Sequence, residues 1–215
     1  MKKTYLEHLF SGIIFLILFI PQVNGQEFTP VKNFDAVQTE INKTAETLTT
    51  IKSRFVQEKH LSFLTEPITS EGLFRYKKEN QLRWEYTQPF QYLILFNGTK
   101  ITIKDQKKTN VFDASANAIF TQINDLMLGS VKGNLGKNKD FSMSLNESAK
   151  QYQLILKPQN ETLKAYVSGV EIYFEKSDLA VSIIRIIEST GDFTKISFKD
   201  RKFNEPIDEN TFNSN

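Results

Sequence analysis

The chain has 215 residues, of which 40% are apolar, 12% aromatic and 24% charged. Lysine and arginine together number 27 and aspartate and glutamate 25, and this near balance argues against a nucleic-acid-binding protein. The lack of cysteine excludes disulfides, thiolate zinc sites, iron–sulfur clusters and a cysteine nucleophile.

Residues 1–25 have the pattern of a cleavable signal peptide. Lys2-Lys3 forms a basic start, residues 9–20 form an apolar run, and small residues precede a cleavage site after Gly25. The run is shorter than the roughly 20 residues that a membrane-spanning helix needs. We therefore expect an exported protein with a single mature domain over residues 26–215, a retained N-terminal anchor being the alternative.

The first mature element is predicted to be a helix with Asn33 as its N-cap, because the asparagine side chain can accept a hydrogen bond from a free first-turn amide. The apolar residues that recur at helical spacing, and so share one face, are Phe34, Val37, Ile41, Ala45 and Leu48.

From Ile51 onward the apolar period changes to two, which predicts strands. The predicted strands are 51–60, 70–77, 81–87, 90–97, 99–105, 139–145, 151–157, 165–175, 180–189 and 192–200. Asn97-Gly98 predicts a short hairpin, since both residues tolerate positive φ.

Residues 117–128 interrupt the strands, because their apolar side chains return to helical spacing. Residues 129–136 contain three glycines and are predicted to be a loop. The whole pattern predicts one curved antiparallel sheet of about 10–11 strands with helices over its concave face. The segment 92–96 is apolar on both faces and must be covered twice.

Enzyme signatures are missing from the sequence. His60 is the only histidine beyond residue 25, no Gly-x-Ser-x-Gly or His-Glu-x-x-His motif occurs, and any metal site would depend on carboxylates. We therefore expect no catalytic residue, no metal and no cofactor. A hydrolase that acts through paired carboxylates stays an alternative.

Several runs of sequence resemble the LolA-type family of periplasmic outer-membrane lipoprotein carriers. In chain order they are FVQE from Phe55, SEGLFRYKK from Ser70, LRWEYTQP from Leu82, LFNG from Leu95, and FNEPID from Phe203 followed by Phe212. The resemblance covers essentially the whole mature chain, and the predicted export signal agrees with it.

The resemblance implies an unclosed antiparallel β-barrel with a helical lid over its concave apolar face. It also implies a monomeric, non-enzymatic carrier in the periplasm that binds acylated lipoproteins or lipid. Such a carrier takes its cargo from an inner-membrane ATP-driven releasing complex toward the outer membrane, where an acceptor is a further candidate partner. A lipid-binding or sensor module of the same fold that transports nothing is the alternative.

The resemblance also implies the residues of the site. The residues expected to bind acyl chains are Phe74, Leu82, Trp84, Tyr86, Ile94, Leu126 and Met127. Lys78 stands where well-studied members carry an arginine that latches the lid, and a lysine lacks the planar fork of arginine. Ordinary core packing is the alternative role for Leu82, Trp84 and Tyr86, and packing of helix against sheet is the alternative for the last two.

Overall fold

The computed structural model of the chain describes residues 27–78, 80–113 and 140–213. The predicted signal peptide and the predicted helix and loop over 117–136 lie outside these residues, and so do Leu126 and Met127.

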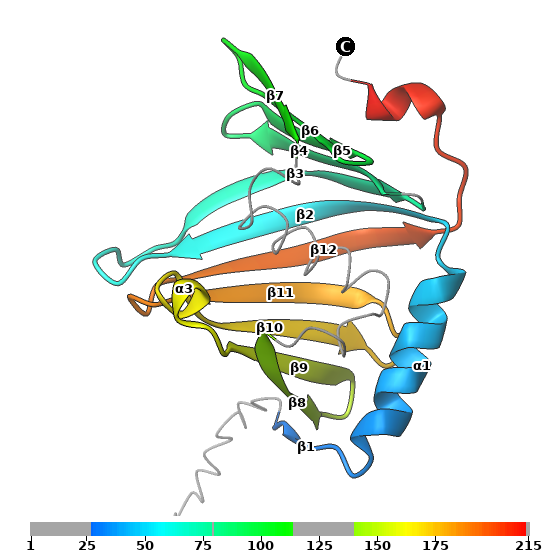
Figure 1. The fold of residues 1–215 in the computed structure, drawn as a ribbon, viewed down its shortest axis with the longest axis vertical. Helices are drawn as coiled ribbons and strands as arrows, with labels where there is room; N and C mark the ends of the chain where they lie inside the picture. Colours follow the sequence, from blue (N-terminus) through cyan, green and yellow to red (C-terminus); the bar gives the residue numbers. More distant parts are fainter. Residues whose placement is uncertain (1–26, 79, 114–139, 214–215) are drawn as a thin grey trace, which may run out of the picture.

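The described residues form one antiparallel sheet with few helices (Figure 1). The strands are β1 (Thr29–Pro30), β2 (Thr50–His60), β3 (Ile68–Lys77), β4 (Gln81–Gln88), β5 (Tyr92–Asn97), β6 (Lys100–Lys104), β7 (Thr109–Asp113), β8 (Phe141–Glu147), β9 (Gln151–Pro158), β10 (Val167–Glu175), β11 (Val181–Glu188) and β12 (Phe193–Phe203). The helices are α1 (Phe34–Thr47), α3 (Glu161–Lys164) and the 3-10 helix η3 (Glu209–Phe212).

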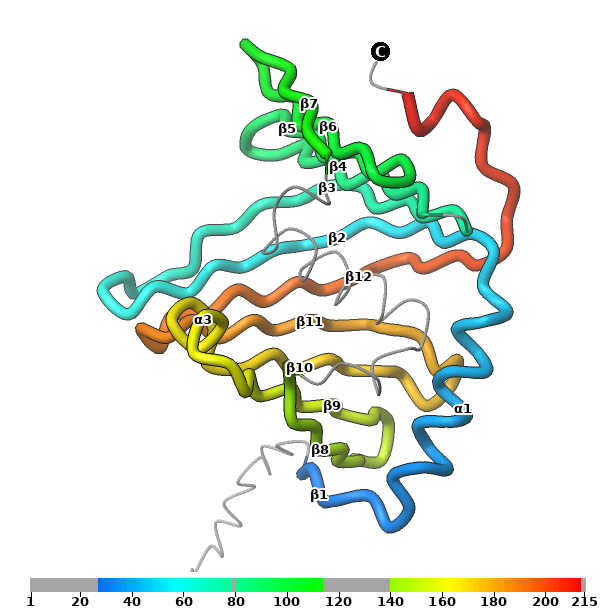
Figure 2. Tube along the Cα trace, in the orientation of Figure 1, coloured from blue at the N-terminus to red at the C-terminus, as the bar shows by residue number. Residues whose placement is uncertain are grey.

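The sheet is unclosed within the described residues. Its order is β1-β8-β9-β10-β11-β12-β2-β3-β4-β5-β6-β7, so β1 and β7 are free edges and every neighbouring pair is antiparallel. Figure 2 shows the twist of the chain from one edge to the other. The predicted mainly-β fold with an unclosed antiparallel sheet is confirmed.

The sheet has twelve strands where about 10–11 were predicted. The two unpredicted strands are the edges, of which β1 has only two residues and β7 leaves Val111 exposed. The predicted strand over 165–175 begins later, at Val167, because the short helix α3 precedes it. Asn160 starts that helix, since its side-chain oxygen accepts from the Leu163 amide at 2.8 Å.

The hairpin between β5 and β6 is present but shifted by one residue. Asn97 pairs with Lys100, so the turn residues are Gly98 and Thr99. Gly98 has a φ of 63°, which suits the first turn position of a type II′ hairpin. Asn97 therefore ends the strand and does not lie in the turn.

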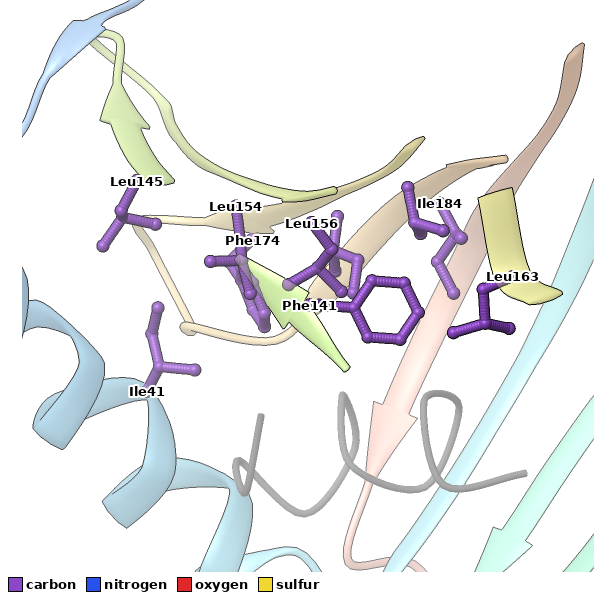
Figure 3. Packing of buried hydrophobic residues seen from close by; sticks show 10 residues of the cluster. Ile41, Phe141, Leu145, Leu154, Leu156, Leu163, Phe174 and Ile184 are labelled. Atoms are coloured by element: carbon purple, nitrogen blue, oxygen red, sulfur yellow. The ribbon is translucent and has the colours of Figure 1, made fainter. Parts of the chain in front are cut away.

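Helix α1 lies across one end of the strands (Figure 1), and its buried residues Ile41 and Ala45 pack on the face of the sheet that we call the inner face. Asn33 is its N-cap as predicted, since its side-chain oxygen accepts from the Ala36 amide at 3.1 Å. Ile41 of α1 lies at one end of an apolar cluster that extends over β8–β11 to α3 (Figure 3). The other side chains of this cluster are Phe141, Leu145, Leu154, Leu156, Leu163, Val170, Ile172, Phe174 and Ile184.

A second apolar cluster continues along the inner face. It consists of Leu48, Ile51, Phe55, Phe74, Tyr76, Leu82, Trp84, Phe96, Ile101 and Ile196. Phe198 of β12 packs against both clusters, so the inner face is apolar from β8 across to β6.

The C-terminal segment covers the opposite, outer face at β4 and β5. Leu95 and Phe212 are both buried, and η3 packs on these two strands. Arg83 holds the segment in place by donating from Nη1 to the carbonyl oxygen of Thr211 at 3.1 Å. The segment 92–96 is thus covered on both faces, as its apolar pattern required.

Candidate functional site

Six aromatic side chains lie in contact on the inner face, and we call them the aromatic floor. They are Phe55, Phe74, Trp84, Tyr86, Tyr92 and Phe198. The Trp84 ring centroid lies 4.8 Å from that of Phe55 and 5.4 Å from that of Phe74. The rings meet at tilted or edge-on angles, the geometry that aromatic quadrupoles favour.

Gly72 makes room for the aromatic floor. It pairs with Phe55 across β2 and β3, and a Cβ on Gly72 would lie 2.6 Å from Cζ of Phe55. The same Cβ would lie 2.0 Å from the carbonyl oxygen of Glu85. Because no side chain stands at this position, Phe55 can cross the backbone of β3 and reach Trp84 and Tyr86.

A cavity of about 40 Å³ lies between α1 and the inner face. Ala45 and Leu48 line it from the helix side, and Phe74, Leu82 and Trp84 line it from β3 and β4. A buried water needs about 10–15 Å³ by the same measure, so this cavity has room for a few waters and not for an acyl chain.

Arg201 is the charged residue in the cavity lining, and its charge is neutralised there. Nη2 donates to Asp178 at 2.9 Å, and Nη1 donates to the carbonyl oxygens of Ala180 and Val181 at 2.9 and 3.1 Å. Sequence reasoning missed this residue, because Arg201 and Asp178 meet only once β11 and β12 pair.

Among the described residues, Ser53 Oγ is buried in the apolar inner face without a hydrogen-bonding partner. Trp84 Nε1 is also buried there and makes no hydrogen bond of ordinary geometry. Tyr86, by contrast, donates from its hydroxyl to Gln57 Oε1 at 2.9 Å. Burial raises the pKa of its phenol, although Trp84 Nε1 lies near enough to the Tyr86 hydroxyl to lower that pKa. An unpaired buried donor costs about 1–3 kcal/mol, so a ligand that accepts from Ser53 or Trp84 would gain affinity.

Lys78 anchors the C-terminal end of α1. Its Nζ donates to the carbonyl oxygen of Glu46 at 3.1 Å, and its backbone amide donates to the carbonyl oxygen of Thr49 at 2.8 Å. Asn204 holds the same junction, because its side-chain oxygen accepts from the amide of Thr49 at 2.8 Å. A cation beside free carbonyls at a helix C-terminus is stabilising.

The structure brings five of the predicted site residues onto the inner face. Phe74, Leu82 and Trp84 line the cavity, whereas Tyr86 and Ile94 pack at the side of the second cluster. The contributions of Phe55 and Phe198 were missed, because alternation groups residues within one strand and only strand pairing brings these two rings against Trp84.

Within the described ranges, no group of three or more His, Cys, Asp and Glu side chains could hold a metal ion. No helix in the same ranges is long and apolar enough to span a bilayer. His60 stacks on Phe193 with ring centroids 4.2 Å apart.

The chain is similar to known proteins over most of its length. A family model described as outer membrane lipoprotein carrier protein LolA matches residues 46–215. An outer-membrane lipoprotein carrier protein of Francisella philomiragia is 30% identical over 148 residues, which cover 69% of this chain and 68% of that protein. One of Pseudomonas aeruginosa is 26% identical over 142 residues, which cover 66% of this chain and 65% of that protein.

Among solved structures, an uncharacterized conserved protein from Thermus thermophilus has a TM-score of 0.51 at 9% identity, over 83% of this chain and 91% of that one. This likeness shows a shared fold. The family match covers the aromatic floor and the whole C-terminal segment, and it confirms the resemblance read from the sequence. The chain therefore belongs to the outer membrane lipoprotein carrier protein LolA family.

Proposed function

We propose that this protein is a periplasmic carrier that binds the acyl chains of lipoproteins on its inner face and moves them from the inner to the outer membrane. The observation that carries the proposal is the apolar inner face, continuous over most of the sheet and bordered at one end by α1, in a chain of this family. The proposed mature protein is residues 26–215, released by cleavage near Gly25.

The physical chemistry of the cargo explains why such a face is needed. Each CH₂ group transferred from water to an apolar surface contributes about 0.8 kcal/mol. Several long acyl chains would gain tens of kcal/mol, so water alone never releases them from a membrane. A carrier must therefore receive cargo by direct contact from a releasing complex and hand it on in the same way.

The cavity between α1 and the inner face, at about 40 Å³, is too small for an acyl chain. We propose that α1 moves away from the sheet to admit one at this end. Lys78 and Asn204 hold the C-terminal end of α1. We propose Lys78 as the latch of this helix, with Phe74, Leu82, Trp84, Tyr86 and Ile94 contacting the acyl chains.

The proposal is tested by release of a triacylated lipoprotein from inner-membrane vesicles that contain the releasing complex and ATP. We expect the purified protein to bring the lipoprotein into the soluble fraction. Ile94→Glu puts a charge on the half-buried inner face and should abolish release, whereas Val111→Glu, at an exposed position of β7, should not. Lipoprotein that stays in the vesicles with the unaltered protein would refute transport.

A further inference from the structure

Five of the exposed large apolar side chains lie along one end of the sheet. They are Phe63 at 77% exposure, Phe90 at 72%, Tyr166 at 61%, Ile68 at 50% and Leu64 at 43%, and we call them the rim. Val111, on the edge strand β7, is the remaining exposed large apolar side chain of the described residues.

The rim comes from loops far apart in sequence that the sheet brings together. Phe63 and Leu64 lie between β2 and β3, Phe90 lies between β4 and β5, and Tyr166 precedes β10. All these loops lie at the end of the sheet away from α1, as Figure 2 shows for the turns after β2 and β11 and for α3.

Hydrogen bonds tie the β2–β3 loop and the start of β10 to the β11–β12 turn. The Ser62 amide donates to Asp192 Oδ1 at 2.8 Å, which joins the β2–β3 loop to the β11–β12 turn. The Ser189 amide donates to the carbonyl oxygen of Tyr166 at 3.2 Å, which joins that turn to the start of β10.

The exposure of Phe63 and Leu64 is built into their loop. The Leu64 amide donates to the carbonyl oxygen of Leu61 at 2.9 Å, which closes a turn around Phe63. With Ser62 held by Asp192, the loop cannot fold back to bury these two side chains without breaking both bonds.

We propose that the rim inserts into the headgroup region of a phospholipid bilayer, so that the protein docks on the membrane surface itself. Several projecting tips rich in aromatic and leucine side chains suit the water–bilayer interface, where amphipathic and aromatic groups concentrate. A protein partner would instead be expected to meet a contiguous apolar patch with a polar border.

The charges near the rim match a zwitterionic headgroup, which carries both an ammonium and a phosphate. Exposed Lys107 and Lys108 lie on the β6–β7 turn at the same end of the sheet, and Glu66 lies on the β2–β3 loop. Asp105 fixes the lysine turn, because its Oδ1 accepts from the amides of both lysines at 2.7 Å.

Ile68 of the rim lies on the same side of the sheet as the inner face. Ile68 pairs with Lys59, and two residues along the same face Ser70 pairs with Gln57, the acceptor of the Tyr86 hydroxyl. When the rim meets a bilayer, this end of the inner face therefore adjoins the lipid. If the proposed function holds, acyl chains could pass between lipid and inner face without crossing water.

The test is flotation of the exported, processed protein with vesicles of phosphatidylethanolamine containing a minor share of phosphatidylglycerol. We expect the protein to float with the vesicles. The double variant Phe63→Ser with Phe90→Ser should reduce the vesicle-bound fraction about tenfold or more, since it removes two large apolar anchors. Val111→Ser, which also loses an exposed apolar side chain, should float like the unaltered protein.

Thermal unfolding followed by circular dichroism checks that the double variant is folded, which its exposed positions lead us to expect. Equal flotation of the double variant and the unaltered protein would overturn the proposal, and so would flotation only with vesicles that carry envelope proteins. Binding of a fatty-acyl probe is measured in parallel. A double variant that no longer floats but still binds the probe supports membrane docking by the rim. If the unaltered protein floats through its rim but binds no probe, the result counts against the proposed function alone.

Discussion

Gly72 lies where the Phe55 ring crosses the backbone of β3, so even the methyl group of an alanine would disturb the aromatic floor. We predict that Gly72→Ala lowers the free energy of unfolding by about 3 kcal/mol or more, because its Cβ would overlap both Phe55 and the carbonyl of Glu85. Denaturant unfolding measures this loss.

Gly169→Ala is the matched control, because the nearest atom to its Cβ would be the carbonyl oxygen of Leu156 at 3.5 Å. We expect Gly169→Ala to leave stability unchanged or to raise it by about 0.5 kcal/mol, since alanine restricts the unfolded chain more than glycine does. Similar losses in the two variants would contradict the role given to Gly72.

Glu85 makes a pH-dependent contribution to the free energy of unfolding. The hydrogen bond from Arg83 Nε, 2.9 Å long, lowers the pKa of this carboxyl below its usual 4.5, with the charges of Arg83 and Arg75 acting in the same direction. The unfolded chain therefore takes up the proton first, so the stabilisation is present above pH 4.5 and is lost as the pH falls through the lower folded-state value.

We predict that Glu85→Gln is less stable than the unaltered protein at neutral pH and that the difference shrinks in acid. Unfolding curves recorded from neutral pH down through the acid range measure both effects. A difference in stability that stays constant with pH would show that the carboxylate charge contributes nothing.

At the scale of elements, the C-terminal segment covers the outer face of β4 and β5, a role that the sequence pattern did not predict. Phe212, the last residue of η3, is 3% exposed, and Arg83 holds the neighbouring backbone. We predict that Phe212→Ala costs about 3–5 kcal/mol in the free energy of unfolding. Phe90→Ala, at a position that is 72% exposed, should change it by less than about 0.5 kcal/mol. Equal effects would contradict the covering role of the segment.

Long strands with strict alternation were predictable from the sequence, because each buries one side of its residues. The edge strands were not, since β1 is too short for a pattern and β7 buries little. The hairpin after β5 was recognised, but its register depended on the pairing of Asn97 with Lys100, which the turn residues alone do not determine. Helix α3 has four residues and depends on its cap at Asn160.

Within the candidate site, residues of the quoted motifs were predictable and residues brought in by pairing were not. Leu82, Trp84 and Tyr86 share a strand face, so alternation alone groups them. Phe198 and Arg201 join them only through the pairing of β12 with β2 and β11. Such distant pairings leave no local signal in one sequence.

At the scale of the whole molecule, one apolar face joins two clusters, and α1 meets both at one end of the sheet. Phe198 bridges the clusters, and α1 contacts one through Ile41 and is followed by Leu48 in the other. Movement of α1 would therefore expose residues of both clusters at the end of the sheet where the helix lies.

The most direct test of acyl binding uses Trp84, the only tryptophan of the chain and 4% exposed in the cavity wall. A peptide carrying brominated acyl chains is added, and the fluorescence of Trp84 is recorded against the same peptide without bromine. We predict strong quenching by the brominated peptide only, since quenching by bromine requires contact. Unchanged fluorescence with a peptide that binds the protein would contradict binding of acyl chains on the inner face.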